Sequence, residues 1–128
     1  MNNESNIVRS ILTDGIQVIS LSGRMTYDSI HEYKDSVIDL IVEADGYILD
    51  LNKIVQIDST GLGLLVNIAK YFIKNKNKMV ILNTDELIIE LFKISKLDEI
   101  FEICDSRAEA IKIVKDEDNT YWSRVMSF

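Results

Sequence analysis

Two apolar stretches open the chain, and each has the length and composition of a β-strand. They cover residues 7–12 and 16–21 and are rich in Ile and Val, as strands commonly are. Between them lies Asp14-Gly15, a dipeptide that favours the left-handed backbone of a tight turn. The sequence therefore predicts that the domain opens with an antiparallel hairpin.

From Ser29 onward the apolar residues recur at helical spacing. They form a stripe along one side of a predicted helix: Ile30, Tyr33, Val37, Leu40 and Ile41. Ser29 and Glu32 have the spacing of a capping box at the helix start, and Gly46 is a stop signal beyond its end. His31 falls on the side away from the stripe, so we expect a solvated surface histidine there.

The remainder of the chain alternates between short apolar runs and helical patterns. Residues 47–51 and 79–82 contain few polar side chains, as in strands that are covered on both faces, and residues 100–103 form a weaker strand pattern. Helical spacing returns after each of these runs, with Thr84 and Ser106 as candidate caps. This order predicts an α/β domain with a mixed β-sheet, right-handed crossovers and packed α-helices.

The length of 128 residues fits one compact domain, which we place at residues 1–115. Residues 116–128 begin with charged and polar side chains and end with an apolar group that includes Tyr121, Trp122, Met126 and Phe128. We expect this segment to be a carboxyl-terminal tail, either docked on the domain or a partner, or flexible.

The charge of the chain argues against several classes of partner. With 14 Lys and Arg against 21 Asp and Glu, the net charge is -7, and such a field repels nucleic acid and anionic membrane surfaces. No leader pattern follows Met1, and no apolar run approaches the roughly 18 residues that span a bilayer. The single cysteine, Cys104, suits a reducing compartment and is expected to be a buried small hydrophobe. We therefore expect a cytoplasmic protein.

The most specific part of the chain is a junction between a buried strand and a helix, which reads Asp58-Ser59-Thr60-Gly61-Leu62-Gly63. Ser59 or Thr60 can cap the helix. Gly61 and Gly63 permit a tight backbone path and close approach by another surface. Asp58 either orients the serine, contacts a partner or favours the helix start electrostatically.

This junction resembles the signature loop of the STAS family of anti-sigma factor antagonists. The resemblance extends from about Ile7 to Val114 and includes Leu21-Ser22-Gly23 at the end of the second strand. It also covers Leu91-Phe92 with Ser95 and Leu97 in the third helical region. In that family the serine that follows the aspartate is phosphorylated, so the resemblance implies that Ser59 is the acceptor. It also implies that the whole junction from Asp58 to Gly63 binds the partner.

The family resemblance implies a protein-binding function, and we expect no catalysis, cofactor or metal. The unphosphorylated protein would bind a serine/threonine kinase that is also an anti-sigma factor, which frees a sigma factor. Phosphorylation by that kinase would end the interaction, and a metal-dependent serine phosphatase would later remove the phosphate. A phosphate adds about -1.5 to -2 charges, which a helix start tolerates but an interface built for a neutral hydroxyl does not.

One departure from the family pattern lies where the second predicted strand ends. The chain reads Gly23-Arg24-Met25-Thr26, whereas Gly-Glu-Leu-Asp is common in the family. Those acids lie near the phosphorylation loop in relatives. Arg24 and Thr26 are therefore expected to contact the partner and to alter its charge preference.

Other functions fit the residues less well. A STAS-type adaptor without phosphorylation switching, in which Ser59 only caps a helix, is the main alternative. A serine hydrolase would need the Gly-x-Ser-x-Gly elbow and a histidine base, and the elbow does not occur. A nucleotide-binding P-loop motif is also missing. One cysteine and one histidine far apart in sequence do not make a metal site.

Overall fold

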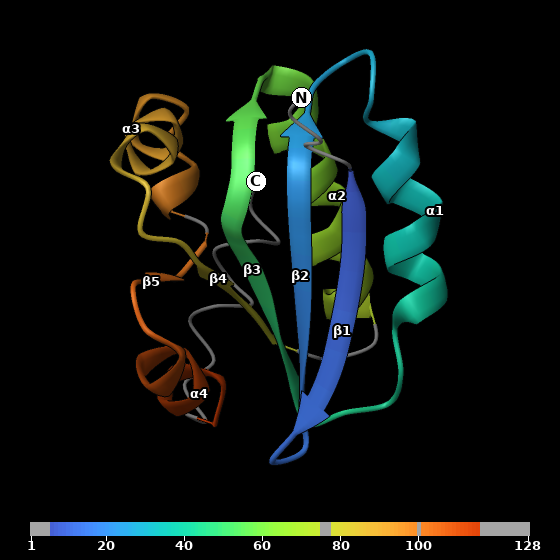
Figure 1. Ribbon diagram of the computed structural model, residues 1–128. Coiled ribbons are helices and arrows are strands. Elements are labelled where there is room, and N and C mark those ends of the chain that lie inside the picture. The colour runs from blue at the N-terminus through green and yellow to red at the C-terminus, as the bar shows by residue number, and fades with distance from the viewer. Residues whose placement is uncertain (1–5, 75–77, 100, 116–128) are drawn as a thin grey trace.

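The computed structural model describes residues 6–74, 78–99 and 101–115, and helices alternate with strands along most of them (Figure 1). The elements are β1 (Ile7–Thr13), β2 (Ile16–Met25), α1 (His31–Leu40), β3 (Gly46–Ile57), α2 (Ser59–Lys74), β4 (Met79–Leu82), α3 (Glu86–Ile94), the short 3-10 helix η1 (Leu97–Glu99), β5 (Ile103–Cys104) and α4 (Arg107–Lys115). The predicted tail at residues 116–128 lies outside the described residues.

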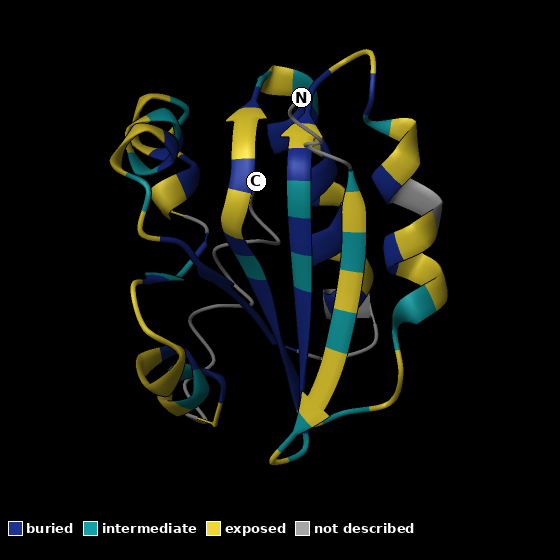
Figure 2. Cartoon of the chain, in the orientation of Figure 1, coloured by how far each residue is buried: buried dark blue, intermediate teal, exposed yellow. Residues whose placement is uncertain are grey.

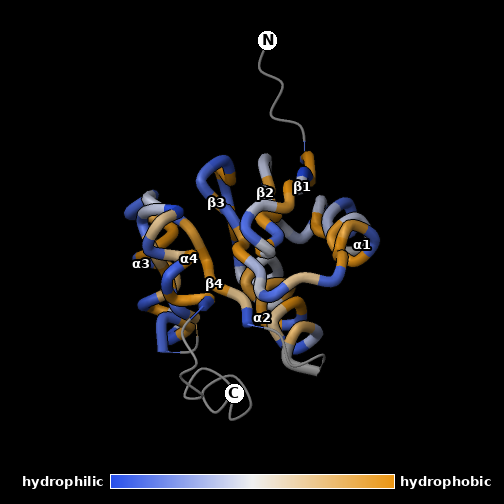
Figure 3. Tube along the Cα trace, turned by 90° about the horizontal axis from the view of Figure 1, so that it is seen from below, coloured by the Kyte–Doolittle hydropathy of each residue, from blue (hydrophilic) through white to orange (hydrophobic). Residues whose placement is uncertain are grey.

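The strands form one mixed sheet in the order β1-β2-β3-β4-β5. β1 and β2 pair antiparallel, whereas the other neighbours pair parallel. Helices α1 and α2 lie side by side along one face of the sheet, and α4 lies on the opposite face (Figures 1 and 3). The prediction of an α/β domain with a mixed sheet is confirmed.

The opening hairpin is confirmed in detail. Thr13 pairs with Ile16, so the turn contains only Asp14 and Gly15. Both have positive φ, 54° at Asp14 and 77° at Gly15, which is the backbone of a type I′ turn. This geometry matches the right-handed twist of the two strands and sets their register.

Strands β2 and β3 are longer than predicted, and both end at the same edge of the sheet. β2 continues to Met25 and β3 to Ile57, and these two residues are paired. The register shifts on the way, because Ser20 pairs with Asp50 but Ser22 pairs with Lys53. One additional residue in β3 therefore bulges between these pairs.

The core lies on both faces of the sheet, and the inner strands are its most buried part (Figure 2). The larger cluster joins the sheet to α1, α2 and α3 and includes Tyr47 and Phe72, whose stacked rings lie 4.2 Å apart. The smaller cluster joins the sheet to α4 and includes Ile48 and Val114. Cys104 is buried in this second cluster, as predicted.

The predicted boundaries of α1 are wrong at both ends. Ile30 occupies the N-cap without a side-chain cap bond, because the Ser29 hydroxyl instead donates to the Arg24 carbonyl at 2.6 Å. The helix ends at Leu40, where the buried Gln17 amide donates to the Leu40 carbonyl at 2.7 Å. Gly46 is not the stop signal but the first residue of β3, where a Cβ would lie 2.0 Å from Val114 Cγ1.

The later elements also depart from the pattern locally. Asp85, not Thr84, caps α3, because the Asp85 side chain accepts from the Leu87 N–H. Thr84 instead donates its N–H to the Asn52 side chain. The Ser106 hydroxyl accepts from the Glu109 N–H at 3.2 Å, so this predicted cap is confirmed. β5 is shorter than expected and lies at residues 103–104, and residue 100 falls outside the described part.

Candidate functional site

The candidate site lies where β2 and β3 end side by side and α2 begins (Figure 1). The carboxyl ends of parallel neighbours meet at one edge of a sheet, and ligands bind at such edges in many α/β folds. The loop after β2 therefore lies against the first turn of α2. The residues predicted to bind a partner lie at this junction: Arg24 at the end of β2, Thr26 in the loop after it, and Asp58 to Gly63 at the start of α2.

Asp58 joins the two segments through its carboxylate. Oδ1 accepts hydrogen bonds from the Thr60 and Gly61 N–H groups at 2.9 and 3.1 Å, which is the bonding of an N-cap. Oδ2 accepts from the Tyr27 N–H at 3.0 Å. The prediction that Ser59 or Thr60 caps this helix is therefore wrong, because Asp58 already occupies the donors that a cap would use.

Ser59 is the first residue of α2 and its side chain is exposed. Within the described residues its hydroxyl has no hydrogen-bond partner. Thr60 is half-buried beside it. Since Asp58 does the capping, the Ser59 hydroxyl is available to another molecule without any loss to the helix.

Gly61 and Gly63 have different surroundings. A Cβ on Gly61 would lie 2.3 Å from the Met25 carbonyl oxygen and 2.7 Å from Ile57 Cγ1, so this glycine lets α2 pack closely on the strand ends. A Cβ on Gly63 would meet nothing within 4 Å. Leu62 points into the core and is 6% exposed. Of these three residues, only Gly63 is exposed.

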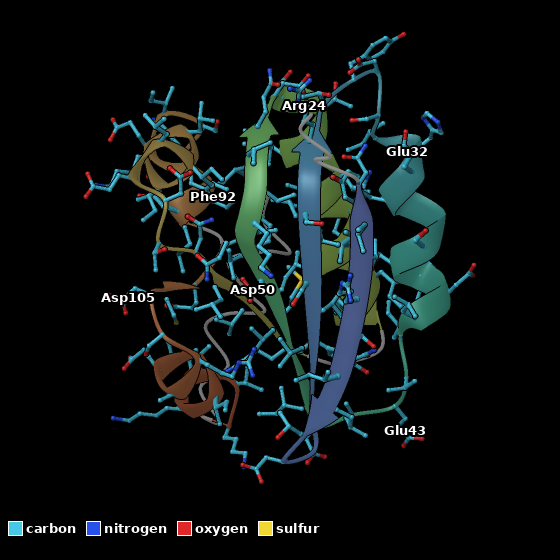
Figure 4. All side chains as sticks on the ribbon, viewed as in Figure 1. Arg24, Glu32, Glu43, Asp50, Phe92 and Asp105 are labelled. Carbon is cyan, nitrogen blue, oxygen red and sulfur yellow. The ribbon has the colours of Figure 1, made fainter. Side chains whose placement is uncertain are left out.

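The loop after β2 is held by its own hydroxyl groups. Thr26 is buried, and its hydroxyl donates to Asp28 Oδ1 at 2.7 Å. The Thr26 hydroxyl, the Asp28 backbone N–H and the positive charge of Arg24 hold the pKa of the Asp28 carboxyl below its usual value, against a smaller opposing effect of burial. Arg24 is exposed at the end of β2 (Figure 4). The residues that depart from the family pattern thus border the start of α2.

The sequence reasoning missed Tyr27, whose side chain is 80% exposed next to this junction. Its N–H bond to Asp58 holds it there. An aromatic residue within the polar stretch from Thr26 to Ser29 was the available signal, since exposed aromatic rings are enriched at binding surfaces.

A family model for the STAS domain matches residues 9–110, which is most of the chain. The chain belongs to the STAS domain family. It is 25% identical over 107 residues to a Thermotoga maritima protein provisionally named an anti-sigma factor antagonist, covering 81% of this chain and 94% of that protein.

Solved structures share this STAS fold. A crystal structure of a Thermotoga maritima protein with the same provisional name matches with a TM-score of 0.77 at 22% identity, over 85% of this chain and 95% of that one. The unphosphorylated form of the anti-sigma factor antagonist SpoIIAA, from Bacillus, matches with a TM-score of 0.67 at 19% identity, over 88% of this chain and 100% of that one. At these identities the structures establish the fold alone.

Nothing in the described part of this STAS domain points to a metal centre or a membrane span. Across residues 6–74, 78–99 and 101–115, no three His, Cys, Asp or Glu side chains gather closely enough to hold an ion. No helix in those ranges is long and apolar enough to cross a bilayer. His31 is exposed, as predicted.

Proposed function

We propose that this STAS domain is an anti-sigma factor antagonist that binds a serine/threonine kinase anti-sigma factor while Ser59 is unmodified, and leaves it once Ser59 is phosphorylated. The hydroxyl at the first residue of α2, which is exposed and has no hydrogen-bond partner among the described residues, carries this proposal. The name of the Thermotoga relative supports it, as do the phosphorylated and unphosphorylated forms in which SpoIIAA has been solved. A metal-dependent serine phosphatase would reset the protein.

The partner-binding surface proposed here combines Ser59, Gly63 and Tyr27. Ser59 and Gly63 are four residues apart in α2, so they lie on the same side of the helix. Tyr27 adds an exposed ring from the neighbouring loop. The missing side chain at Gly63 lets a partner backbone approach α2 closely, and a phosphate on Ser59 would stand directly in that approach.

Asp58 makes the effect of a phosphate larger. Its carboxylate already accepts from the Thr60 and Gly61 N–H groups, so these two donors cannot neutralise a phosphate on Ser59. The phosphate would bring about -1.5 to -2 charges next to that carboxylate. Mutual repulsion turns the new group outward, where a partner would have to desolvate it. Binding is then lost while the fold stays intact.

The decisive experiment is the intact mass of the protein recovered from its own cells, with the modified residue located by fragmentation. We expect one phosphate, on Ser59. In a reaction with the purified kinase, Ser59→Ala should bind the kinase but accept no phosphate, whereas the neighbouring Thr60→Ala should be modified like the wild type. Full modification of Ser59→Ala would refute the site. Stable binding without any phosphorylation would favour the adaptor function.

A further inference from the structure

A groove of about 280 Å³ lies on the face of the sheet that α4 covers only in part. Its charged and hydroxyl-bearing lining comes from four elements: Arg9 of β1, Ser20 and Ser22 of β2, Asp50 and Lys53 of β3, and Arg107 of α4. Asp50 lies part-way along β3, whereas Arg24 marks the distant end of β2 near the Ser59 junction (Figure 4). The groove is therefore a separate feature of the molecule.

The bulge between β2 and β3 builds this groove. Ser20 and Ser22 are two residues apart and share a face of the sheet. Their partners, Asp50 and Lys53, are three residues apart and would face opposite sides in a regular strand. Because the additional residue in β3 lies between them, both side chains reach the same face. Arg9, paired with Ser20 across the hairpin, joins them there.

The three cations have no evident role in stability. All are exposed, and within the described ranges none forms an ion pair. Arg107 is the first residue of α4, where the helix dipole disfavours a positive charge. Their convergence on one groove stands out in a chain of net charge -7. Side chains whose position is unfavourable for the stability of the fold are characteristic of binding sites.

We propose that this groove binds a small phosphorylated molecule that also carries a hydroxyl group, such as a sugar phosphate. Guanidinium groups match phosphate oxygens with paired N–H donors, and the Ser20 hydroxyl adds one more donor, whereas the Ser22 hydroxyl already donates to the Ile7 carbonyl at 3.4 Å. Asp50 can only accept when ionised, so it receives a hydroxyl of the ligand. The groove volume of about 280 Å³ lies just below the usual range of small-molecule sites, which begins at about 300 Å³.

The test is a titration of the full-length protein with inorganic phosphate and with ribose 5-phosphate, followed by amide NMR shifts. A salt concentration of about 0.15 M limits the reach of distant charges to about 8 Å. We expect saturable shifts at residues 20, 22 and 53. Arg9→Gln and Arg107→Gln should each weaken phosphate binding about fivefold, the effect of one close charge pair in water.

Two further variants predict a gain in phosphate affinity and no change in it, respectively. Asp50→Asn should tighten inorganic phosphate, because a repelling charge is removed, but reduce the preference for ribose 5-phosphate. Lys112→Gln removes an exposed charge from the same helix α4 outside the groove and should change nothing. An equal loss in Lys112→Gln, a weakening by Asp50→Asn, or unshifted amides at the groove would each overturn the proposal.

Discussion

Replacing each of the two glycines at the start of α2 by alanine should separate the stability of the fold from partner binding. Gly61→Ala introduces a methyl group 2.3 Å from the Met25 carbonyl oxygen and 2.9 Å from Met25 Cβ. That carbonyl cannot simply move away, because it accepts from the Asp58 N–H at 3.2 Å. At Gly63 the same methyl group meets nothing within 4 Å.

The two variants should therefore change stability in opposite directions. Overpacking typically costs about 1–3 kcal/mol. For Gly61→Ala we expect a cost at the upper end of this range, because the new methyl group meets the backbone of Met25 and not a flexible side chain. The helix preference of alanine offsets about 1 kcal/mol of that, which leaves a net loss of about 2 kcal/mol. Gly63→Ala should be more stable than the wild type by about 0.5–1 kcal/mol, because alanine favours the helix over glycine and no overpacking opposes it. For a chain of this size, 1 kcal/mol corresponds to about 4 °C in Tm.

Thermal unfolding followed by circular dichroism measures both changes. The two variants should differ in stability by roughly 3 kcal/mol, which at about 4 °C per kcal/mol corresponds to a difference of about 12 °C in Tm. Calorimetric titration with the kinase partner then tests the surface. Gly63→Ala should bind about tenfold more weakly despite its higher stability, because the methyl group overpacks the interface. Equal stability of the two variants would refute the packing argument, and unchanged partner affinity for Gly63→Ala would remove Gly63 from the proposed surface.

Three other perturbations test the site and the core. Ser59→Glu should leave the circular dichroism spectrum unchanged and weaken kinase binding only in part, since a carboxylate carries less charge than a phosphate; calorimetric affinity equal to that of the wild type would argue against a charge switch. Asp58→Ala should lower the free energy of unfolding in urea by about 2 kcal/mol through the lost cap and the lost Tyr27 bond, whereas Asp58→Asn, which can still cap, should lose less. Burial, followed by the charges of Glu109, Glu102 and Asp105, raises the pKa of the Cys104 thiol from 9.0 to about 11. The stability that the protonated Cys104 thiol contributes is fully present below pH 9 and is lost as the pH rises toward 11. The urea midpoint of Cys104→Ala should therefore fall less steeply over that pH range than the midpoint of the wild type. Parallel curves for the two proteins would contradict the raised pKa.

The elements that sequence patterns predicted well are those specified by neighbouring residues. Asp14-Gly15 favours one turn type whatever surrounds it, and the continuous apolar runs at β3 and β4 match strands covered on both faces. The order of these elements then leaves few arrangements for an α/β sheet. The fold therefore followed from local signals and chain order.

The helix caps were harder to predict, because at two helix starts two neighbouring residues are both able to cap the helix. Thr84 and Asp85 are both good caps, as are Asp58 and Ser59. The choice depends on which residue has extended backbone before the helix, as Asp85 does at φ -77° and ψ 116°. Packing of the preceding strand decides this, and a sequence pattern does not contain it.

The groove could not be predicted for a similar reason. A period of two assigns Asp50 and Lys53 to opposite faces of β3, and only the register against β2 reveals the bulge that brings them together. Arg9 and Arg107 lie far apart in sequence, and no local pattern connects them. Sites assembled from several strands become visible only once the strands are paired.

The Asp58 carboxylate also has a consequence for the motions of this edge of the domain. Three amides, that of Tyr27 in the loop after β2 and those of Thr60 and Gly61 in the first turn of α2, donate to this one side chain. A single rotation of that side chain would expose all three to solvent together. Their hydrogen exchange should therefore follow one shared opening event, at a common rate, although 31 residues of chain separate Asp58 from Tyr27.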